Sequence, residues 1–363
     1  MAKPRLIAFY LPQFHPIPEN DEWWGKGFTE WTNVGKAKKL FPGHYQPKVP
    51  ADLGYYDLRL PEVREEQAKL AKEAGVTGFC YWHYWFGNGK ELLEKPFKEV
   101  LRLGKPDFPF CLAWANESWY AKLWDKDTRK DKLLIEQQYG GIEDYTAHFY
   151  SVLPAFKDKR YLTQDGKPIF MIYKPFAFAD LKLFMETWNE LAKKEGLKGI
   201  FWIAHLFCND SKIDECLKLG FEAVNVNDAY KMSAEYNFFH KSANWILRKF
   251  LRIPYILDYR KMSKKFVSVS LFENAKVCPC IISGWDHTPR SGNKGVVMSH
   301  YTPKTFKAHV HDVFEKIKKY GHGYNDMVFI KSWNEWAEGN YLEPDLKYGK
   351  QFLEVLKSEV DEY

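Results

Sequence analysis

Eight short apolar runs, each followed by a segment with helical spacing, constrain the possible folds of this chain more than any other feature. They fall at residues 6–11, 76–82, 108–115, 168–173, 199–204, 223–226, 278–282 and 327–330. Each run is continuously apolar rather than alternating, as expected for parallel strands that are covered on both faces. Eight such strand–helix units predict an α/β fold, a single (β/α)₈ TIM barrel.

The segments between the runs support the same fold. Helical spacing and terminal Gly or Pro signals predict helices at 60–74, 90–103, 142–157, 179–195, 211–219, 263–276, 303–320 and 348–361. The length of 363 residues suits a barrel with extended βα loops. The chain shows no linker, repeat or low-complexity tract, so we expect one catalytic domain over residues 1–363, with an insertion at about 227–262.

The last apolar run changes abruptly into a stretch rich in carboxylates. Glu335 and Glu338 follow residues 327–330 and are interleaved with Trp333 and Trp336. Catalytic groups of parallel α/β folds sit where strands end, and side chains three apart share one side of a helical turn. Sugar chemistry needs one protonated carboxyl group and one that acts as base or nucleophile. We predict Glu335 and Glu338 as the catalytic pair; two solvated loop glutamates are the alternative.

Polar and aromatic residues near the other strand ends form the predicted substrate-binding face. The loop at 21–33 is too polar for a core and too aromatic for a linker, which favours an active-site loop over a packed lid. Glu117 fits a catalytic role and a contact to a sugar hydroxyl equally well, whereas His205 fits a structural or substrate contact better than catalysis. The predicted substrate-binding residues are Tyr10, His15, Trp24, Glu30, Trp31, His83, Trp85, Asn116, Glu117, Tyr173, His205, Trp285, Asp286 and Asn334.

Composition narrows the class of ligand. The chain has 14 Trp and an aromatic fraction of 17%, more than a core needs, and flat rings suit the C–H-rich faces of sugars. A net charge of +6 is mild for this length and argues against a dedicated nucleic-acid binder. No metal-ligand pattern, dinucleotide fingerprint or P-loop is present, so we expect neither a metal nor a cofactor. The expected partner is an oligo- or polysaccharide.

The expected location is the cytoplasm. Four of the six cysteines lie in or beside apolar runs, which indicates buried free thiols in a reducing compartment. The first residues lead into a strand without an apolar signal segment. No apolar run reaches the roughly 18 residues of a membrane-spanning helix.

The insertion carries a basic and aromatic stretch. Residues 241–265 contain eight Lys or Arg and one acid, Asp258. Such a helix could touch a membrane surface or an anionic lipid-linked sugar. The preferred interpretation is an ordinary helix that packs its apolar stripe on the barrel and leaves its basic face in water.

Six motifs together resemble one known family. They lie at residues 8–16, 24–31, 78–82, 114–117, 284–290 and 332–339, and the combination is similar to the WbsX family over essentially the whole chain. Members of that family are encoded in polysaccharide biosynthesis loci and are often named glycosyltransferases. The family looks like a relative of the endo-α-mannosidases of glycoside hydrolase family 99. The loop at 24–31 departs from those mannosidases, so their substrate is not carried over.

The resemblance implies roles for the two glutamates. The acids of the mannosidase motif Asn-Glu-Trp-x-Glu-Gly map onto Glu335 and Glu338. The first would act as base on the sugar's own 2-hydroxyl, which gives a 1,2-anhydro sugar intermediate and net retention. The second would protonate the leaving oxygen and then deprotonate the incoming water. This chemistry requires a substrate with a 2-hydroxyl trans to the leaving group.

Three functions remain open at this point. A retaining glycoside hydrolase or transglycosylase acting on a bacterial surface polysaccharide, such as O-antigen or capsule, or on its precursor, is favoured. A glycosyltransferase in O-antigen or capsule biosynthesis is the alternative, although no Asp-x-Asp pair of the usual metal-binding kind is found. A non-catalytic sugar-binding barrel is disfavoured by the intact pair.

Overall fold

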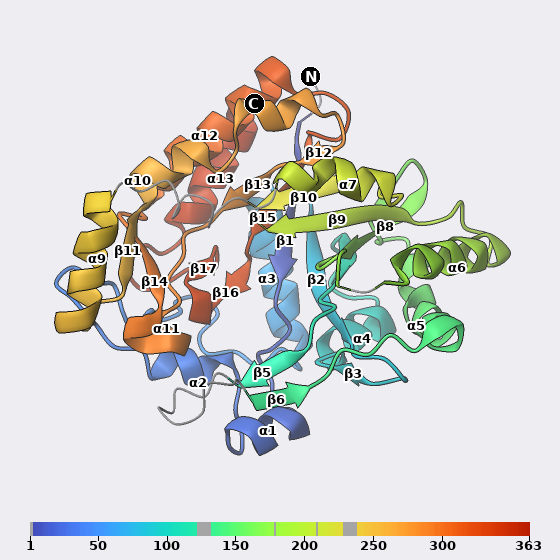
Figure 1. Cartoon of the computed structure of the whole chain (residues 1–363), viewed down its shortest axis with the longest axis horizontal. Coiled ribbons are helices and arrows are strands. Elements are labelled where there is room, and N and C mark those ends of the chain that lie inside the picture. Colours follow the sequence, from blue (N-terminus) through green and yellow to red (C-terminus); the bar gives the residue numbers. More distant parts are fainter. Residues whose placement is uncertain (1–2, 122–131, 178, 208–209, 228–237) are drawn as a thin grey trace.

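The computed structural model describes residues 3–121, 132–177, 179–207, 210–227 and 238–363. Its centre is a closed parallel barrel (Figure 1). The strands pair in the order β1, β2, β4, β8, β9, β10, β12/β13 and β15, and β15 pairs with β1. Their bounds are β1 Arg5–Tyr10, β2 Gly78–Trp85, β4 Phe110–Trp114, β8 Lys167–Ile172, β9 Phe201–Phe207, β10 Ala223–Asn227, β12 Val277–Cys278, β13 Cys280–Ile282 and β15 Met327–Lys331. The predicted (β/α)₈ barrel is confirmed.

Two short strands close the barrel at its seventh position. Pro279 separates β12 from β13, since proline has no N–H to donate to a ladder. β12 pairs with β10, as in Asn225 with Cys278, and β13 pairs with β15, as in Cys280 with Phe329. The carbonyl of Pro279 still accepts a hydrogen bond from the Phe329 amide at 2.9 Å. The interruption therefore leaves the ring of strands joined on both sides.

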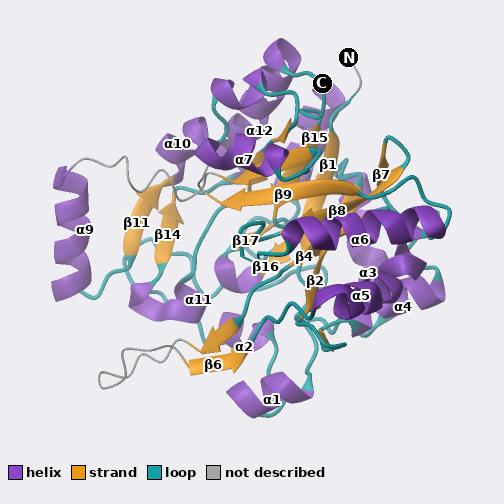
Figure 2. Cartoon of the chain, turned by 45° about the vertical axis from the view of Figure 1, so that its right-hand side comes forward, coloured by secondary structure: helices purple, strands orange, loops and turns teal. Residues whose placement is uncertain are grey.

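Helices cover the outside of the barrel (Figure 2). α5 lies against α6, and α12 lies against α13. The covering helices are α3 Pro61–Glu73, α4 Lys95–Leu103, α5 Gly141–Phe156, α6 Leu181–Lys194, α7 Ile213–Lys218, α12 Pro303–Tyr320 and α13 Gln351–Glu362. The strands are buried on both faces, which explains why they read as continuous apolar runs.

Two predicted helices are corrected. The helix expected at 90–103 begins only at Lys95, because Pro96 fits the first turn and not the interior, and Glu91–Leu92 forms strand β3 against β2. The helix expected at 263–276 is replaced by 3₁₀ turns at Ser263–Lys265 and Val269–Glu273. The buried apolar residues there are Phe266, Val267, Leu271 and Phe272. Two adjacent pairs, 266–267 and 271–272, do not form one narrow stripe along an α-helix.

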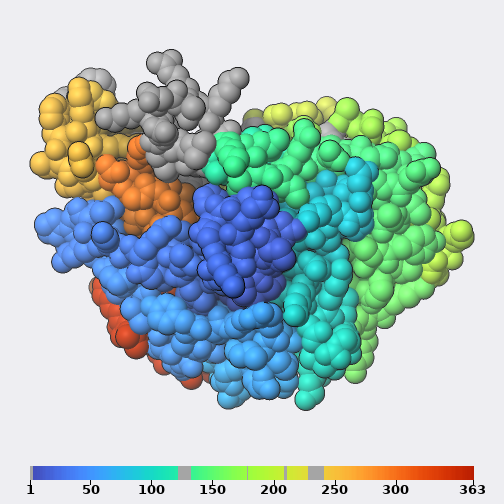
Figure 3. Space-filling model, turned by 90° about the horizontal axis from the view of Figure 1, so that it is seen from below, coloured from blue at the N-terminus to red at the C-terminus, as the bar shows by residue number. Residues whose placement is uncertain are grey.

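The βα loops hold elements that the sequence did not predict. The loop after β1 contains α1 Pro18–Trp24 and α2 Glu30–Gly35, and this N-terminal segment spreads across the face seen in Figure 3. Further pairs are β5 Trp119–Ala121 with β6 Lys132–Ile135, β11 Tyr255–Asp258 with β14 Val296–Ser299, and β16 Asn334–Glu335 with β17 Asn340–Tyr341. Short helices α10 Tyr259–Met262 and α11 Thr288–Ser291 lie beside these strands.

The insertion predicted at 227–262 is only partly described, because residues 228–237 lie outside the described ranges. It contains α9, Phe238–Phe250, whose Asn244 side chain accepts a hydrogen bond from the Ile256 amide of β11 at 2.9 Å. The preferred interpretation had the apolar stripe of this helix on the barrel. Instead, its large apolar side chains at Trp245, Ile246 and Phe250 are 57%, 49% and 67% exposed. Among the described helices, none is long and apolar enough to cross a membrane.

Candidate active site

The segment after β15 brings the two predicted glutamates to the end of the barrel. β16 carries Glu335, and a 3₁₀ turn, Trp336–Glu338, carries Glu338. Asn334 fixes the entry to this turn, because its side chain accepts from the Leu11 amide at 2.8 Å and donates to the Leu11 carbonyl at 3.0 Å. The turn is closed by Trp336, whose ring stacks on that of Tyr341 at 3.8 Å.

Gly339 allows the turn to pack closely against its neighbours. Its φ is +65°, a value that glycine adopts at no steric cost. A Cβ atom there would lie 2.6 Å from Cβ of Asp286 and 2.7 Å from Nζ of Lys48. The glycine therefore permits Glu338 to approach the segment that follows β13.

One guanidinium joins three carboxylates at this point. Arg290 of α11 donates through Nη1 to Oε1 of Glu338 at 2.5 Å, and its Nη2 lies 3.0 Å from Oε2 of Glu30 and 3.7 Å from Oε2 of Glu335. Glu30 and Glu335 are buried, with exposed fractions of 3% and 7%. Lys331, the last residue of β15, adds a second cation, 3.9 Å from Glu338. A planar fork suits such multiple contacts better than an ammonium group.

The two glutamates differ in the ease with which they ionise. Burial raises the pKa of Glu335 to about 7, and the nearby Glu338 charge acts in the same direction. Burial would also raise the pKa of Glu338, but Arg290, Lys331 and His287 outweigh it and lower that pKa. When Glu335 is protonated, the carboxylates of Glu30 and Glu338 remain, and they face two cations, Arg290 and Lys331. The ligand-free site therefore combines a carboxylic acid with a carboxylate near pH 7, as acid–base chemistry on a glycosidic bond requires.

Aromatic side chains lie beside the pair inside the barrel mouth. The ring of Tyr173 stacks on His205 at 5.3 Å and meets Trp82 edge-on at 5.3 Å. Burial raises the pKa of Tyr84, and the charge of Glu335 adds to this shift. Burial likewise raises the pKa of Tyr173, with further contributions from Glu117, Glu338 and Glu335. These phenols therefore stay protonated and can donate hydrogen bonds.

Several predicted site residues lie in or at this cluster. Glu30 contacts Arg290 directly. His205 is buried and hydrogen-bonded to Asn225 at 2.8 Å, and burial lowers its pKa to about 4, so it is a neutral wall residue. Trp285 lies under the Lys331 ammonium at 5.2 Å. Glu117 forms an ion pair with Lys174 and is partly exposed at the rim.

Other predicted residues hold the loops instead of facing the pair. Asn334 clamps Leu11, as described above. The side chain of Asn116 donates to the Lys174 carbonyl at 2.9 Å and accepts from the Lys174 amide at 2.8 Å. Asp286 accepts from His44 at 2.9 Å, Gln46 at 2.7 Å and the Thr288 hydroxyl at 2.6 Å. These groups are already satisfied by the protein.

Three predicted residues point out of the barrel. The Tyr10 hydroxyl donates to Gln67 of α3 at 2.6 Å. His83 and Trp85 both contact His148 of α5, at 2.8 Å between ring nitrogens and 4.7 Å between ring centroids respectively. These three side chains lie between the sheet and its covering helices.

The three remaining residues lie in the loop after β1. Trp31 packs against Trp336 at 5.5 Å, behind the pair. His15 is buried and hydrogen-bonded to the Pro12 carbonyl at 3.0 Å. Trp24 is 46% exposed and packs on Phe28. The structure does not bring His15 or Trp24 into contact with the two glutamates.

Comparisons with known proteins place the chain in a family. A family model described as "Glycosyltransferase WbsX" matches residues 6–356. The chain belongs to the WbsX family. Proteins described as "Uncharacterized protein WxcX" from two strains of Xanthomonas campestris pv. campestris are each 35% identical to it over 360 residues, 97% of this chain and 49% of theirs. The chain thus spans about half the length of these curated relatives.

Solved structures show the same fold for this WbsX-family chain. A "Glycoside hydrolase-like protein" aligns with a TM-score of 0.63 and 14% identity, over 99% of this chain and 94% of that one. The GH99 endo-α-mannosidase from Bacteroides thetaiotaomicron, in complex with BIS-TRIS-propane, aligns with a TM-score of 0.59 and 13% identity, over 99% and 97%.

Sequence reasoning missed five residues of the cluster in this WbsX-family chain. Arg290 and His287 stand in the motif at 284–290, and Lys331 directly follows the last apolar run, but none was singled out. Trp82 and Tyr84 alternate with His83 and Trp85 on β2, so one pair must face inward and the other outward. The alternation along a strand shows that the two pairs face opposite sides, but it does not show which pair faces inward.

In the described residues, no group of three or more His, Cys, Asp or Glu could hold a metal ion.

Proposed function

We propose that this WbsX-family protein is a glycoside hydrolase that cleaves a bacterial surface polysaccharide, such as O-antigen or capsule, or its precursor. The observation that carries the proposal is the Glu335–Glu338 pair held on Arg290 at the carboxyl end of the barrel, where burial raises the pKa of Glu335 and nearby cations lower that of Glu338. Family membership and fold both support a carbohydrate-active enzyme. The aromatic side chains beside the pair suit a sugar ring.

The proposed reaction follows from the resemblance to the GH99 enzymes. Glu335 removes the proton of the sugar's 2-hydroxyl, and the resulting oxygen displaces the leaving group at the anomeric carbon while Glu338 protonates the departing oxygen. Water then opens the 1,2-anhydro ring, with its proton going to Glu338 and the 2-oxygen recovering the proton from Glu335. The two displacements give net retention.

Without substrate, the pKa shifts of Glu335 and Glu338 favour the opposite protonation states to those that these roles require. Arg290 binds Glu338 directly, which favours its ionised form, whereas Glu335 is the member that keeps a proton. For Glu338 to act first as an acid, substrate must weaken its contact with Arg290 so that the proton can move between the two carboxyl groups. An aryl glycoside with an activated leaving group tests this, because such a substrate needs little acid assistance. The proposed roles predict that this substrate restores turnover in Glu338→Gln more than in Glu335→Gln; the opposite result would make Glu335 the acid.

A glycosyltransferase is the alternative, favoured by the description of the family model. The deciding experiment incubates the protein with the surface polysaccharide of its own organism, with and without nucleotide sugars, and follows the products by mass spectrometry. Hydrolysis predicts shortened chains without a donor, whereas extension that needs a nucleotide sugar would refute the proposal.

Substitution of the pair links the activity to the site. Glu335→Gln and Glu338→Gln should each lower turnover by about 10²–10⁴-fold while glycan binding persists, since removal of an acid–base group has this effect. The matched control is Glu354→Gln, on the exposed face of α13. Full turnover in both variants of the pair would show that these glutamates are not catalytic.

A further inference from the structure

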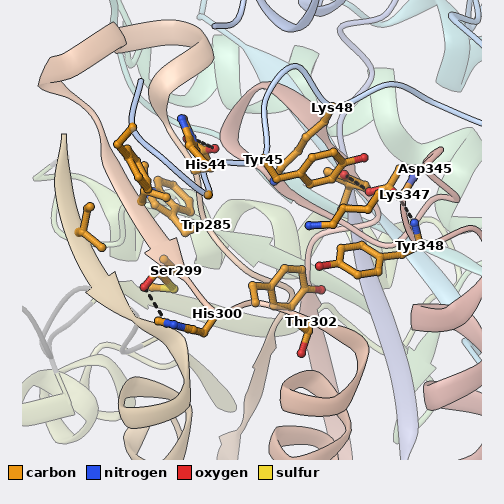
Figure 4. A pocket seen from close by; sticks show the side chains of 18 of the residues that line it. His44, Tyr45, Lys48, Trp285, Ser299, His300, Thr302, Asp345, Lys347 and Tyr348 are labelled. Carbon is orange, nitrogen blue, oxygen red and sulfur yellow. Dashed lines mark hydrogen bonds and ion pairs between the residues drawn. The ribbon is translucent and has the colours of Figure 1, made fainter. Parts of the chain in front are cut away.

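A cavity of about 500 Å³ lies beside the candidate active site and is not part of the glutamate cluster. It is bounded by the loop at 41–48, by the end of β14 with residues 300–302, and by the segment at 341–352. Figure 4 shows Tyr45, Lys48, Lys347 and Tyr348 on one side of it and Ser299, His300 and Thr302 on another. The volume falls within the range of roughly 300–1,000 Å³ that is typical of small-molecule sites.

Aromatic rings form part of its walls. The lining includes Phe41, Tyr45, Trp285, Tyr301, Tyr348 and Phe352. Lys347 lies over the rings of Tyr45 and Tyr348, at 4.5 and 4.7 Å from their centroids. Flat faces with polar edges suit the alternating C–H and hydroxyl surface of a sugar.

Lys48 is a buried cation in this lining. Its exposed fraction is 8%, its Nζ donates one hydrogen bond of 3.3 Å to the Gly339 carbonyl, and it lies 5.1 Å from the centroid of the Tyr341 ring. Among the described residues no carboxylate forms an ion pair with it. Asp286 and Asp345 attract it from beyond ion-pair distance. An ammonium group has three donors, and burial with one of them hydrogen-bonded is costly. The same burial lowers the pKa of Lys48.

The two carboxylates of the lining are already engaged by the protein. Asp286 holds His44, Gln46 and Thr288, as described above. Asp345 accepts from the Tyr341 hydroxyl at 2.6 Å and from the amides of Lys347 and Tyr348 at 2.9 and 2.7 Å. The Tyr301 hydroxyl is buried and has no hydrogen-bond partner among the described residues. The groups left for a ligand are therefore mainly donors and cations.

We infer that this cavity binds a sugar residue that carries a carboxylate, a hexuronic acid or a similar acidic sugar. The carboxylate would pair with Lys48, the ring would lie between the aromatic walls, and a sugar hydroxyl would accept from Tyr301. The choice of a sugar over another small anion rests on the proposed function. An acidic component would then belong to the polysaccharide that the enzyme recognises.

The cavity shares a wall with the glutamate pair. Lys48 contacts the carbonyl of Gly339, the residue directly after Glu338, and the Asp286 amide donates to the Glu338 carbonyl at 2.6 Å. Trp285 lines the cavity and also lies under Lys331, which faces Glu338. An acidic sugar on Lys48 would therefore be held next to the turn that carries Glu338.

The test compares three probes by ligand-observed NMR on the wild-type protein: D-glucuronate, D-glucose and inorganic phosphate. D-glucuronate should bind, and Lys48→Met should weaken its binding by about tenfold or more, as expected for loss of a charged hydrogen bond. A cooperative thermal transition in Lys48→Met checks that the variant is folded. Lys304→Met, an exposed lysine on α12, is the matched control and should leave D-glucuronate binding unchanged.

Each other outcome overturns the inference. Equal binding of D-glucose would show a neutral sugar pocket, and equal displacement by phosphate would show a site for anions in general. Unchanged D-glucuronate binding in Lys48→Met would place the ligand elsewhere, and no binding of any probe would refute the site. Because no step requires turnover, these results are independent of whether the enzyme cleaves a polysaccharide.

Discussion

Arg290 lowers the pKa of Glu338 more than any other residue does. It contacts Glu30, Glu335 and Glu338 with one planar group, and it opposes the effect of burial on Glu338. Arg290→Gln should therefore raise the pKa of Glu338. The limb of the pH profile of kcat/KM that reports this group should move to higher pH, and turnover should fall. Arg102→Gln, on the exposed face of α4, is the control; an unmoved limb would show that Arg290 does not set this ionisation.

The raised pKa of Glu335 leads to a second prediction, about the pH dependence of stability. Its pKa is about 7 in the folded protein and 4.5 ordinarily, so the folded state binds the extra proton between these values. The free energy of unfolding therefore falls as pH rises from about 4.5 to about 7. Glu335→Gln should remove this loss and stabilise the protein above pH 7 by roughly 1–3 kcal/mol. Urea denaturation at pH 5 and pH 8 measures this difference in the free energy of unfolding, with Glu354→Gln as control. If Glu335→Gln were less stable than wild type at pH 8, the raised pKa of Glu335 would be contradicted.

At the residue scale, the sequence predicted which residues lie near the strand ends. It did not predict whether each side chain faces into the barrel or out toward the covering helices. The rule that chemistry sits at strand ends led to Glu335, Glu338, Tyr173 and His205. It could not show that His83 faces α5, because the inward face of a strand depends on its register with its neighbours. It also could not show that Asn116 is engaged by backbone groups of another loop, since such contacts join residues distant in the chain.

Among the elements, the turn after β15 depends on a connection to β1. Asn334 satisfies both backbone groups of Leu11, just beyond β1, and is itself fully buried. Asn334→Ala should destabilise the protein by about 2–4 kcal/mol, because it leaves a buried donor and a buried acceptor unpaired, and should lower turnover through displacement of the turn. Asn334→Asp keeps the acceptor but loses the donor, so its stability should lie between that of wild type and that of Asn334→Ala. Thermal unfolding with parallel turnover measurements checks this; a wild-type melting temperature in Asn334→Ala would exclude the connection.

The elements were predicted where burial follows a simple period. Strands covered on both faces and helices such as α12, which has Pro303 and a capping box at its start, leave clear signals. The segment at 263–276 misled because its composition permits a helix while its buried residues need a different shape. α9 shows the converse: its helical pattern was recognised, but the exposure of Trp245 and Phe250 depends on what surrounds them, which periodicity does not report.

The whole molecule is defined by the closure of the barrel. β1, near the start of the described chain, pairs with β2 on one side and with β15, after residue 326, on the other. β12 pairs with β10 and β13 pairs with β15, which joins residues 277–282 to the same ring. Neither half of the chain can therefore complete its sheet alone. The sequence predicted this ring from the number and order of its apolar runs.

Closure has a thermodynamic consequence that tests the expectation of one domain over residues 1–363. If the barrel is one cooperative unit, denaturant unfolding followed by far-UV circular dichroism and by tryptophan fluorescence should give coincident transitions, because the 14 Trp are spread along the chain. Trp245→Phe, on exposed α9, controls for a locally unfolding insertion and should leave the midpoint unchanged. Two separated transitions in wild type, of which one disappears in Trp245→Phe, would assign the insertion to a unit of its own. Two that persist would divide the barrel itself, and the β1–β15 pairing would then not hold its two ends together.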